Sequence, residues 1–352
     1  MNNASFMSEV ISLTDIGSIG EEIQALGVPV RALGMSRGWP NPLAVLTLAN
    51  WLRQSKPDVI QTWMYHADLL GGIAAKLAGG VPVAWGIHHF NLDNQYNKRS
   101  TIWTAKICAR LSCWLPEKIV CCSEATRQVH VDLGYVSNKI VVIPNSIDLS
   151  VFKPDAMARK SIRKELGISQ STPLIGMVAR FDPQKDHRNF VDAAKILHDD
   201  YPDVHFLFCG SGVTWDNERL VNWIDSTGIR HCFHLLGLRH DVERITAALD
   251  VATLSSYGES FSLIIGEAMA SGIPCVTSDI PAPVELLGGY GWVVPIHDSH
   301  ALCSAWEEIL CSSRDVVQKR QDAARERIKN EFSLELMVKR YQHLFVDLYE
   351  SS

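Results

Sequence analysis

The chain has 352 residues, a formal net charge of −6 and a hydrophobic fraction of 47%. This length is long for one domain and sufficient for two, each able to bury its own core. The negative balance excludes a general nucleic-acid binder, because there is no pervasive positive field to neutralise phosphates. The nine cysteines, an odd number without regular spacing, predict free thiols in a reducing compartment.

The sequence shows no targeting or membrane-spanning segment. The first ten residues have neither a basic start nor an apolar core of the kind a secretory signal needs. The longest apolar stretch, 69–87, contains Lys76 and is broken by Gly-Gly-Val-Pro at 79–82, so it predicts a helix, a turn and a buried strand. We therefore expect a cytoplasmic protein.

In the first part of the chain, short β-rich runs alternate with longer amphipathic segments. The β-rich runs predict strands over 9–14, 58–62, 81–87, 118–122 and 140–143. The amphipathic segments predict helices over 20–27, 42–55, 67–77, 99–114 and 124–133. Such alternation is typical of βαβ units around a parallel sheet, which bind ligands at the carboxyl ends of their strands.

A polar, charged segment over 155–171 then predicts a helix and a connector. A second alternating series predicts strands over 174–178, 204–209, 233–236, 251–254 and 273–277, with helices over 188–197 and 333–348. We therefore expect an α/β protein with two Rossmann-like domains facing a cleft. The expected parts are a first domain over 1–152, a connector over 153–172, a second domain over 173–330, and a terminal helix over 331–352 that returns to the first domain.

Two carboxylates, Glu259 and Glu267, are separated by seven residues that predict a Ser-rich loop opening a helix. Eight steps at helical rise span about 12 Å, roughly the distance from the ribose of a nucleotide sugar to its sugar ring. The helix N-terminus between them suits a diphosphate, because it offers free N–H groups and a positive dipole end. One acid can then bind ribose hydroxyls and the other the sugar. The alternative is a solvated loop acid and a capped or paired helix residue.

Two cations follow the first strand of the second domain. Arg180 ends that strand, and a Pro-containing turn presents Lys185 just before a helix. Both are placed to bind a diphosphate, although a solvated loop with two incidental bases is the alternative. Gly212 ends the next strand in a tight turn that backbone can use to approach a ligand, and the turn before Arg239 could line a base pocket.

The first domain offers one candidate side chain. His88 ends a strand in Trp-Gly-Ile-His-His and could hydrogen-bond a sugar hydroxyl or support developing charge. A lone histidine in such a place is more often structural. The sequence contains no Asp-x-Asp and no His/Cys cluster with zinc spacing, so we expect no metal at the site.

Together these segments resemble family 4 (group 1) of the glycosyltransferases, retaining enzymes of the two-Rossmann GT-B fold that use nucleotide-sugar donors. Pro-Asn-Ser-Ile-Asp at 144–148 resembles the family's Pro-Asn-Gly-Val-Asp turn, and 178–185 resembles its Gly-Arg-Leu…Glu-Lys-Gly diphosphate motif. The stretch 258–270 matches the family's Glu-x7-Glu signature. The segment 85–89 is similar to bacterial enzymes that build surface polysaccharides.

The resemblance implies roles for individual residues. Arg180 and Lys185 would bind the donor diphosphate, Glu267 the ribose, and Glu259 the transferred sugar, with His88 beside that sugar. The expected catalytic residues are His88 and Glu259, and the expected donor-binding residues are Arg180, Lys185, Gly212, Ser260, Phe261, Ser262, Leu263 and Glu267. The nucleoside diphosphate sugar is the donor substrate, and no cofactor is expected.

The chain also departs from the family pattern. Gln184 replaces a usual Glu, Asp186 a usual Gly, and Ser260 the glycine that commonly follows the first Glu. The larger departure is that residue 9 enters at what resembles the family's second strand, so the first strand and its glycine-rich loop are expected to be absent. That strand is central in a doubly wound sheet, and its neighbours would stay unpaired unless the sheet closes around the gap. An upstream start or a truncated gene would equally account for the gap.

The helix over 98–114 predicts a surface partner. Its basic and tryptophan residues are Lys98, Arg99, Trp103, Lys106, Arg110 and Trp114. This combination suits peripheral contact with an anionic bilayer, where a lipid-linked acceptor would lie. The alternative is an ordinary amphipathic helix whose tryptophans pack on the sheet, and both interpretations stay open.

The expected function is transfer of a sugar, with retention, to a saccharide or lipid-linked acceptor in surface polysaccharide or lipopolysaccharide assembly at the cytoplasmic face of the inner membrane. A second hypothesis is a non-catalytic nucleotide-sugar-binding or scaffold protein, since the first strand is expected to be missing. A weaker third is another two-Rossmann enzyme, such as a sugar-nucleotide epimerase or a phosphorylase.

Overall fold

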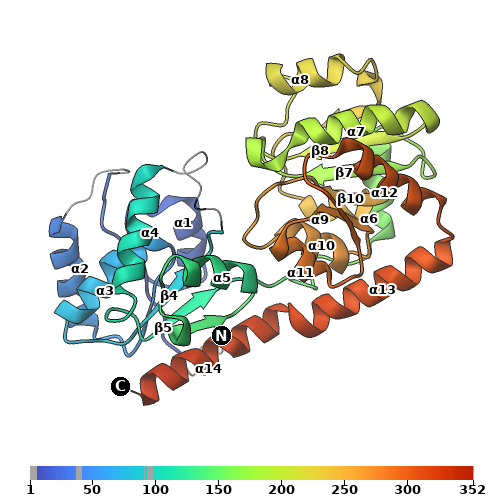
Figure 1. Ribbon diagram of the computed structural model, residues 1–352. Helices are drawn as coiled ribbons and strands as arrows, with labels where there is room; N and C mark the ends of the chain where they lie inside the picture. Colours follow the sequence, from blue (N-terminus) through green and yellow to red (C-terminus); the bar gives the residue numbers. More distant parts are fainter. Residues whose placement is uncertain (1–5, 37–41, 91, 93–97, 352) are drawn as a thin grey trace. The chain divides into compact units, whose positions relative to one another are not determined.

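The structure, a computed structural model, describes residues 6–36, 42–90, 92 and 98–351 (Figure 1). The chain divides into two compact units, one within 1–143 and 338–352 and the other within 144–337. Each unit is an α/β structure whose strands pair in parallel, as expected from the alternating pattern of strands and helices.

The second unit is built on a six-stranded sheet of order β12-β11-β10-β7-β8-β9. Its strands are β7 (Leu174–Val178), β8 (His205–Cys209), β9 (Phe233–Leu235), β10 (Val251–Leu254), β11 (Cys275–Ser278) and β12 (Trp292–Val294). The five strands predicted here are confirmed, and β12 was missed. The predicted start of β11 at 273 was wrong, because the Ile273 N–H still bonds the Ala268 carbonyl at the end of the preceding helix.

The helices of this unit are α6 (Ala156–Glu165), α7 (His187–Asp200), α8 (Glu218–Asp225), α9 (Val242–Ala248), α10 (Leu263–Ala270), α11 (Pro281–Leu287), α12 (Ser299–Cys311) and α13 (Arg314–Glu331). The last helix, α14 (Leu334–Glu350), starts here and continues in the first unit from residue 338. Several helices begin at a side chain that accepts a backbone N–H, which satisfies a donor that the first turn leaves unpaired. These caps are Asp155, Asp186, Asn217, Ser262 and Asp298.

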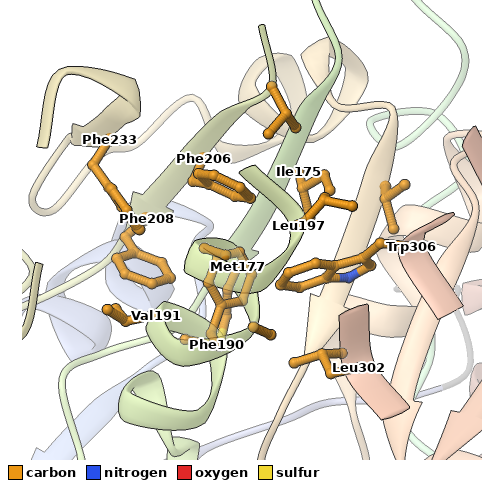
Figure 2. Packing of buried hydrophobic residues seen from close by; sticks show 14 of the residues in the cluster. Ile175, Met177, Phe190, Val191, Leu197, Phe206, Phe208, Phe233, Leu302 and Trp306 are labelled. Atoms are coloured by element: carbon orange, nitrogen blue, oxygen red, sulfur yellow. The ribbon is translucent and has the colours of Figure 1, made fainter. Parts of the chain in front are cut away.

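An aromatic cluster forms the core of the second unit (Figure 2). The ring of Phe190 lies 4.7 Å from that of Phe208 and 4.9 Å from that of Trp306. The Trp306 indole also donates to Thr253 Oγ1 at 2.9 Å, so its buried N–H has a partner on β10. This packing fixes α7 and α12 against the strands whose carboxyl ends carry the candidate site.

A buried arginine anchors α6, in the segment where we expected a connector. The Arg163 side chain is fully buried and donates to Asp250 Oδ2 at 2.5 Å and to the Thr172 carbonyl at 2.6 Å. Asp250 also accepts the Leu174 N–H at 2.8 Å, where β7 begins. The helix is therefore packed into the second unit at the start of its sheet.

Arg163→Met is expected to lower the free energy of unfolding of this unit by about 2 kcal/mol, because the variant loses the buried guanidinium's bonds to Asp250 and to the Thr172 carbonyl, while Asp250 keeps its pair with Arg159 at 2.7 Å. The matched control is Arg188→Met, whose exposed i,i+4 pair with Asp192 should contribute only about 0.5 kcal/mol. Chemical denaturation followed by circular dichroism measures both. Equal losses in the two variants would contradict a special role for Arg163.

The first unit contains two separate parallel sheets, β1-β2 and β3-β4-β5-β6. The strands are β1 (Val10–Ser12), β2 (Val30–Ala32), β3 (Ile60–Gln61), β4 (Val83–Ile87), β5 (Lys118–Cys121) and β6 (Ile140–Val142), and only β2 was missed. The helices are α1 (Gly17–Ala25), α2 (Pro42–Ser55), α3 (Tyr65–Leu77), α4 (Arg99–Leu111) and α5 (Glu124–Asp132). α1 begins three residues earlier than predicted. α4 ends three residues earlier, where the Ser112 hydroxyl bonds the Ala109 carbonyl.

The two sheets of the first unit do not pair with each other in the described part of the chain. β1 pairs only with β2, and β3 only with β4, among the residues the structure describes. Ile11 of β1 and Ile60 of β3 nevertheless pack against the same buried cluster, which includes Leu48. The two sheets thus share an apolar layer without pairing.

Candidate functional site

Three loops meet at the carboxyl edge of the second unit's sheet, after β7, β8 and β9. The Phe181 N–H bonds the Ser211 carbonyl at 2.7 Å, and the Gly210 N–H bonds the Gly237 carbonyl at 2.8 Å. Gly210 has a φ of +146°, and a Cβ there would lie 2.3 Å from the Ala179 carbonyl oxygen. Only glycine fits this close approach of two backbones. The predicted glycine turns are therefore neighbours of the loop that carries the predicted cations.

Arg180 and Arg239 differ in how strongly they are already bound. Arg180 leaves 64% of its side chain exposed, and its nearest acid is Asp182 at 3.2 Å. Arg239 makes a two-pronged bond to the carboxylate of Asp241, at 2.8 and 2.9 Å. The two-pronged bond of Arg239 is typical of guanidinium–carboxylate pairs. Of the two arginines, only Arg180 is exposed enough to bind an added anion. The carbonyl of Gly212 accepts a side-chain amide at 2.6 Å, which fixes its turn.

The structure brings Lys185 and Glu259 into direct contact, although sequence analysis gave them separate roles. The Lys185 ammonium pairs with Glu259 Oε1, and their side chains are only 18% and 13% exposed. The same oxygen accepts the Ser256 hydroxyl at 2.9 Å, and the Ser255 hydroxyl bonds the Lys185 carbonyl at 2.9 Å. Sequence analysis missed these two serines, and the signal for them was a polar pair directly after the apolar strand β10.

The departure at Gln184 is accommodated by a glycine. The Tyr257 N–H bonds the Gln184 carbonyl at 3.0 Å, which joins the loop after β10 to the short 3₁₀ turn Pro183–Lys185. A Cβ on Gly258 would lie 2.3 Å from the Gln184 amide nitrogen. The Gln184 side chain therefore packs over Gly258, and this contact sets the approach of Lys185 to the loop that contains Glu259.

The stretch before α10 performs several local tasks. Ser262 caps the helix by accepting the Ile265 N–H at 3.4 Å, so its side chain serves the fold. Phe261 is buried and packs on the Phe332 ring at 5.9 Å between centroids. Leu263, the first helical residue, is 44% exposed. The N–H groups of this first turn are the ones that an anion at the helix N-terminus would bind.

The expected 12 Å helical span between the two acids was wrong. Glu259 and Ser260 precede α10 in irregular backbone, and only the four steps from Leu263 to Glu267 are helical. The serine-rich loop is longer than the pattern suggested, because the helix starts after its Ser262 cap and not at the first acid. The two acids still flank the N-terminus of one helix, which is the arrangement that the predicted roles require.

Glu267 is a buried acid with no ion-pair partner among the described residues. Among the described residues its Oε2 atom is buried and has no hydrogen-bond partner. Burial raises the pKa of Glu267 to about 7, because desolvation disfavours the ionised form. The alternative of a paired helix residue is therefore not what the described residues show. A buried acceptor of this kind is ready to take a donor from a ligand hydroxyl.

The Pro-Asn-Ser-Ile-Asp turn at 144–148 packs against α10. Ile147 is buried, and its N–H bonds the Phe332 carbonyl at 2.8 Å. A Cβ on Gly266 would lie 2.7 Å from Ile147 Cδ1, so the helix packs directly on this side chain. The turn thus positions the residue next to Glu267.

His88 belongs to the first unit, whereas the other predicted site residues belong to the second. It follows β4 directly, its Nε2 atom is buried without a partner among the described residues, and burial lowers the pKa of its imidazole. The end of β4 is held by Asp68, whose Oδ1 accepts the Thr62 hydroxyl at 2.5 Å and the Gly86 N–H at 3.3 Å. His88 is therefore a neutral imidazole on a strand that is fixed two residues earlier.

The tryptophans of this segment are exposed. Trp103 in α4 is 65% exposed and Trp114, in the turn after α4, is 61% exposed, so the interpretation that they pack on the sheet was wrong. A pocket of about 510 Å³ on this helix is lined by Arg99, Ile102, Trp103 and Lys106. Within the described ranges, the helices are too short or too polar to cross a bilayer.

Two protein-family models match the sequence. The one described as Glycosyltransferase Family 4 matches residues 8–151, and the one described as Glycosyl transferases group 1 matches residues 172–312. Between them they include every residue of the predicted site. The boundary between the two matches falls in the segment around α6.

Similar curated proteins include two that act on diphosphoundecaprenol-linked sugars by name. The UDP-Gal:α-D-GlcNAc-diphosphoundecaprenol α-1,3-galactosyltransferase of Escherichia coli is 29% identical over 313 residues, which are 87% of this chain and 79% of that protein. The N,N′-diacetylbacillosaminyl-diphospho-undecaprenol α-1,3-N-acetylgalactosaminyltransferase of Campylobacter jejuni is 26% identical over 291 residues, 79% of this chain and 75% of that protein.

Solved structures match the fold at low sequence identity. Anabaena Alr3699/HepE, in complex with UDP and glucose, has a TM-score of 0.83 at 19% identity and covers 96% of this chain and 91% of its own. A glycosyltransferase from Rickettsia africae has a TM-score of 0.84 at 20% identity, with 98% and 90% covered. These likenesses establish the architecture of the chain.

Proposed function

Because this chain belongs to family 4 (group 1) of the glycosyltransferases and has their GT-B fold, we propose that it transfers a hexosyl group, with retention, from a nucleoside diphosphate sugar to a lipid-linked acceptor. The observation that carries this proposal is the buried Glu267 Oε2 atom on α10, which has no hydrogen-bond partner among the described residues. It lies close to the N-terminus of α10, and the Lys185–Glu259 pair involves the loop that leads into this helix. A carboxylate, a cation and free N–H groups are what ribose, diphosphate and sugar hydroxyls need.

The proposed donor contacts follow from exposure and charge. Glu267 accepts the ribose hydroxyls, which satisfies its buried oxygen. Arg180 and the first turn of α10 bind the diphosphate, and Lys185 joins them when the donor's negative charge competes with Glu259 for its ammonium. Glu259, released in part, is then free to accept a sugar hydroxyl. The nucleotide is proposed to lie against Gly212 and the neighbouring loops at the same sheet edge.

In the proposed transfer, the bond from the anomeric carbon to the diphosphate oxygen breaks while the acceptor oxygen bonds to the same face. The diphosphate leaves with the electron pair and accepts the acceptor's hydroxyl proton, so charge and atoms balance. The leaving group gains negative charge, and preorganised cations and N–H groups stabilise it without a metal or other cofactor. The neutral imidazole of His88 is proposed to hydrogen-bond the transferred sugar.

The function is tested by a thermal shift with UDP-, GDP-, ADP- and TDP-sugars, followed by nuclear magnetic resonance of the product's anomeric centre. We expect a selective shift with one base and a product of the donor's own configuration. A thermal shift without any product, over a panel of diphosphate-linked acceptors, would mean that the chain binds the donor without transferring its sugar.

A non-catalytic donor-binding protein is therefore the second candidate function. One observation favours it, which is that the β1 and β3 strands of the first unit do not pair with each other.

The acceptor's lipid anchor suggests a membrane contact through α4. The exposed residues Arg99, Trp103, Lys106 and Arg110 follow one another at helical spacing on one face of α4, and the exposed Trp114 lies in the turn that follows the helix. Tryptophans that reach the headgroup level and basic side chains beside them favour an anionic bilayer.

A variant with Trp103→Ala and Lys106→Ala is expected to bind phosphatidylglycerol vesicles at least tenfold more weakly than the unaltered chain in a sedimentation assay, because both an apolar and a basic contact are lost. Lys160→Ala, on the outer face of α6, is the control for loss of one positive charge. Vesicle binding that is equal in both variants, or equal for neutral phosphatidylcholine vesicles, would contradict this face.

A further inference from the structure

Two histidines and a cysteine meet at the opposite edge of the second unit's sheet. His198 lies in the last turn of α7, and His231 and Cys232 lie in the short 3₁₀ helix Arg230–Cys232 just before β9. Their ligand atoms all lie within 4.8 Å of one another. The Cys232 Sγ atom is 3.7 Å from His198 Nδ1, and the rings of His198 and His231 are edge to face at 5.8 Å between centroids.

We propose that His198, His231 and Cys232 bind a zinc ion that ties the end of α7 to the start of β9. Imidazole nitrogen and thiolate sulfur are the ligands zinc prefers, and tetrahedral geometry with ordinary Zn–S and Zn–N bonds places neighbouring ligand atoms about 3.3–3.6 Å apart. The observed 3.7 Å between sulfur and His198 nitrogen already fits that geometry. His231 is exposed, so its ring can rotate by the remaining ångström or so without disturbing the core.

The cysteine is the fixed member of the cluster. Cys232 is 1% exposed and packs with the hydrophobic core that includes Phe206 and Phe233. His198 is half-buried above it, and His231 faces solvent. Cys232 is thus a rigid ligand, His198 a partly restrained one and His231 an adjustable one. Zinc prefers four ligands, so a water molecule would fill the fourth position. Sequence spacing gave no sign of this cluster, because 32 residues separate His198 from His231.

Zinc binding changes the charge at the cluster. A thiolate is the sulfur ligand of zinc, so the Cys232 thiol loses its proton and one proton is released as the Zn–S bond forms. The Asp203 carboxylate near this thiol also offsets the positive charge that the ion brings.

Two further histidines lie near the cluster. His205, the first residue of β8, lies with its Nδ1 atom 2.9 Å from His234 Nε2, and the two rings stack. Burial is the largest cause that lowers the pKa of His205, and His231 and His198 add to it, so these rings lie in one region of the unit.

The site is remote from the proposed donor residues within the second unit. Strands β8 and β9 begin beside the cluster, whereas Arg180, Lys185 and Glu259 follow the carboxyl ends of β7 and β10. In a parallel sheet these are opposite edges. The proposed ion therefore lies away from the donor residues of this unit, and the inference does not depend on the proposed transferase function.

The test is a zinc titration of the full chain, freed of metal by chelation, against a chromophoric zinc indicator. We expect one ion per chain and release of one proton per ion. Replacement of zinc by Co²⁺ should give the thiolate-to-cobalt charge-transfer absorption that only a sulfur ligand produces. His231→Ala and Cys232→Ser should each weaken zinc binding at least 30-fold, since each removes one of three ligands.

Matched controls separate ligand loss from loss of fold. Cys303→Ser replaces another buried cysteine of the same core, and His300→Ala removes another exposed histidine; both should keep zinc affinity within twofold. Because Cys232 is buried, its variant could unfold, so the decisive variant is His231→Ala with circular dichroism unchanged. Zinc affinity unchanged in His231→Ala, or cobalt binding without a thiolate band, would overturn the proposal. Zinc should also raise the melting temperature of the unaltered chain and not that of His231→Ala.

Discussion

Glu267→Gln is expected to lower kcat/KM for the donor by about 100-fold, while making the second unit more stable at pH 8. The loss of activity follows from the role proposed for this carboxylate as the acceptor of ribose hydroxyls. Gln offers one acceptor oxygen without charge, so its hydrogen bonds to the ribose are weaker than charge-assisted ones. The gain in stability follows from removing a buried carboxylate that has no counter-charge among the described residues.

The sign of the stability change depends on pH. The pKa of Glu267 rises from 4.5 to about 7 on folding, so the folded state holds a proton that the unfolded state has lost between these values. The free energy of unfolding therefore falls as pH rises from about 4.5 to 7, by at most about 3 kcal/mol. Gln does not ionise, but its amide meets the same apolar surroundings. We expect a net gain of about 1–2 kcal/mol at pH 8 and no gain at pH 4.5.

Donor binding should show the opposite dependence on pH. The ionised carboxylate is the better acceptor for ribose hydroxyls, so donor affinity in the unaltered chain should rise up to tenfold per pH unit below 7 and level off above it. Calorimetric titrations at pH 6, 7 and 8 measure this, with flat affinity expected for Glu267→Gln. Glu218→Gln, an exposed acid at the start of α8, is the control. Full activity in Glu267→Gln would remove its proposed role, and lower stability at pH 8 would contradict the burial argument.

The strands of the second unit could be predicted because they are unusual in sequence. β7, β8 and β10 are almost entirely buried, mostly apolar runs with Pro173, Gly210 and Asp250 respectively at one end, which is typical of central parallel strands. β2 and β12 have three residues each and one exposed position; β2 has an arginine at its centre, and the Trp-Val-Val run of β12 is too short to mark a strand. Short edge strands of this kind depend on the sheet that they join, and the sequence of the strand itself carries little of that information.

The sequence predicted which loops carry the candidate residues, but not the contacts between those residues. The motif spacing placed Lys185 and Glu259 on loops at one sheet edge, which the strand order β10-β7 confirms. Their direct ion pair could not be predicted, because it depends on the Tyr257–Gln184 bond and on the room that Gly258 leaves. The missing counter-charge of Glu267 is likewise a property of packing, since the absence of a partner leaves no pattern in the sequence.

Lys185→Ala is expected to lower kcat by about 10²–10³-fold, because the departing diphosphate loses a cation that the donor recruits from Glu259. The same change leaves Glu259 mostly buried, with the Ser256 hydroxyl still donating to it but no cation beside it, so the free energy of unfolding should fall by about 1–3 kcal/mol. Stability and catalysis are thus both affected in this single variant. Lys195→Ala, which removes an exposed i,i+4 pair with Asp199, should change neither by a measurable amount.

The double variant Lys185→Ala, Glu259→Gln separates the two effects. Removing both charges of a buried pair avoids the uncompensated carboxylate, so most of the lost stability should return in denaturation experiments. Catalysis should not return, because the diphosphate still lacks its cation and the sugar lacks its carboxylate. If transfer recovered together with stability, Lys185 would be a structural partner of Glu259 and the diphosphate would be held by Arg180 and the helix N-terminus without it.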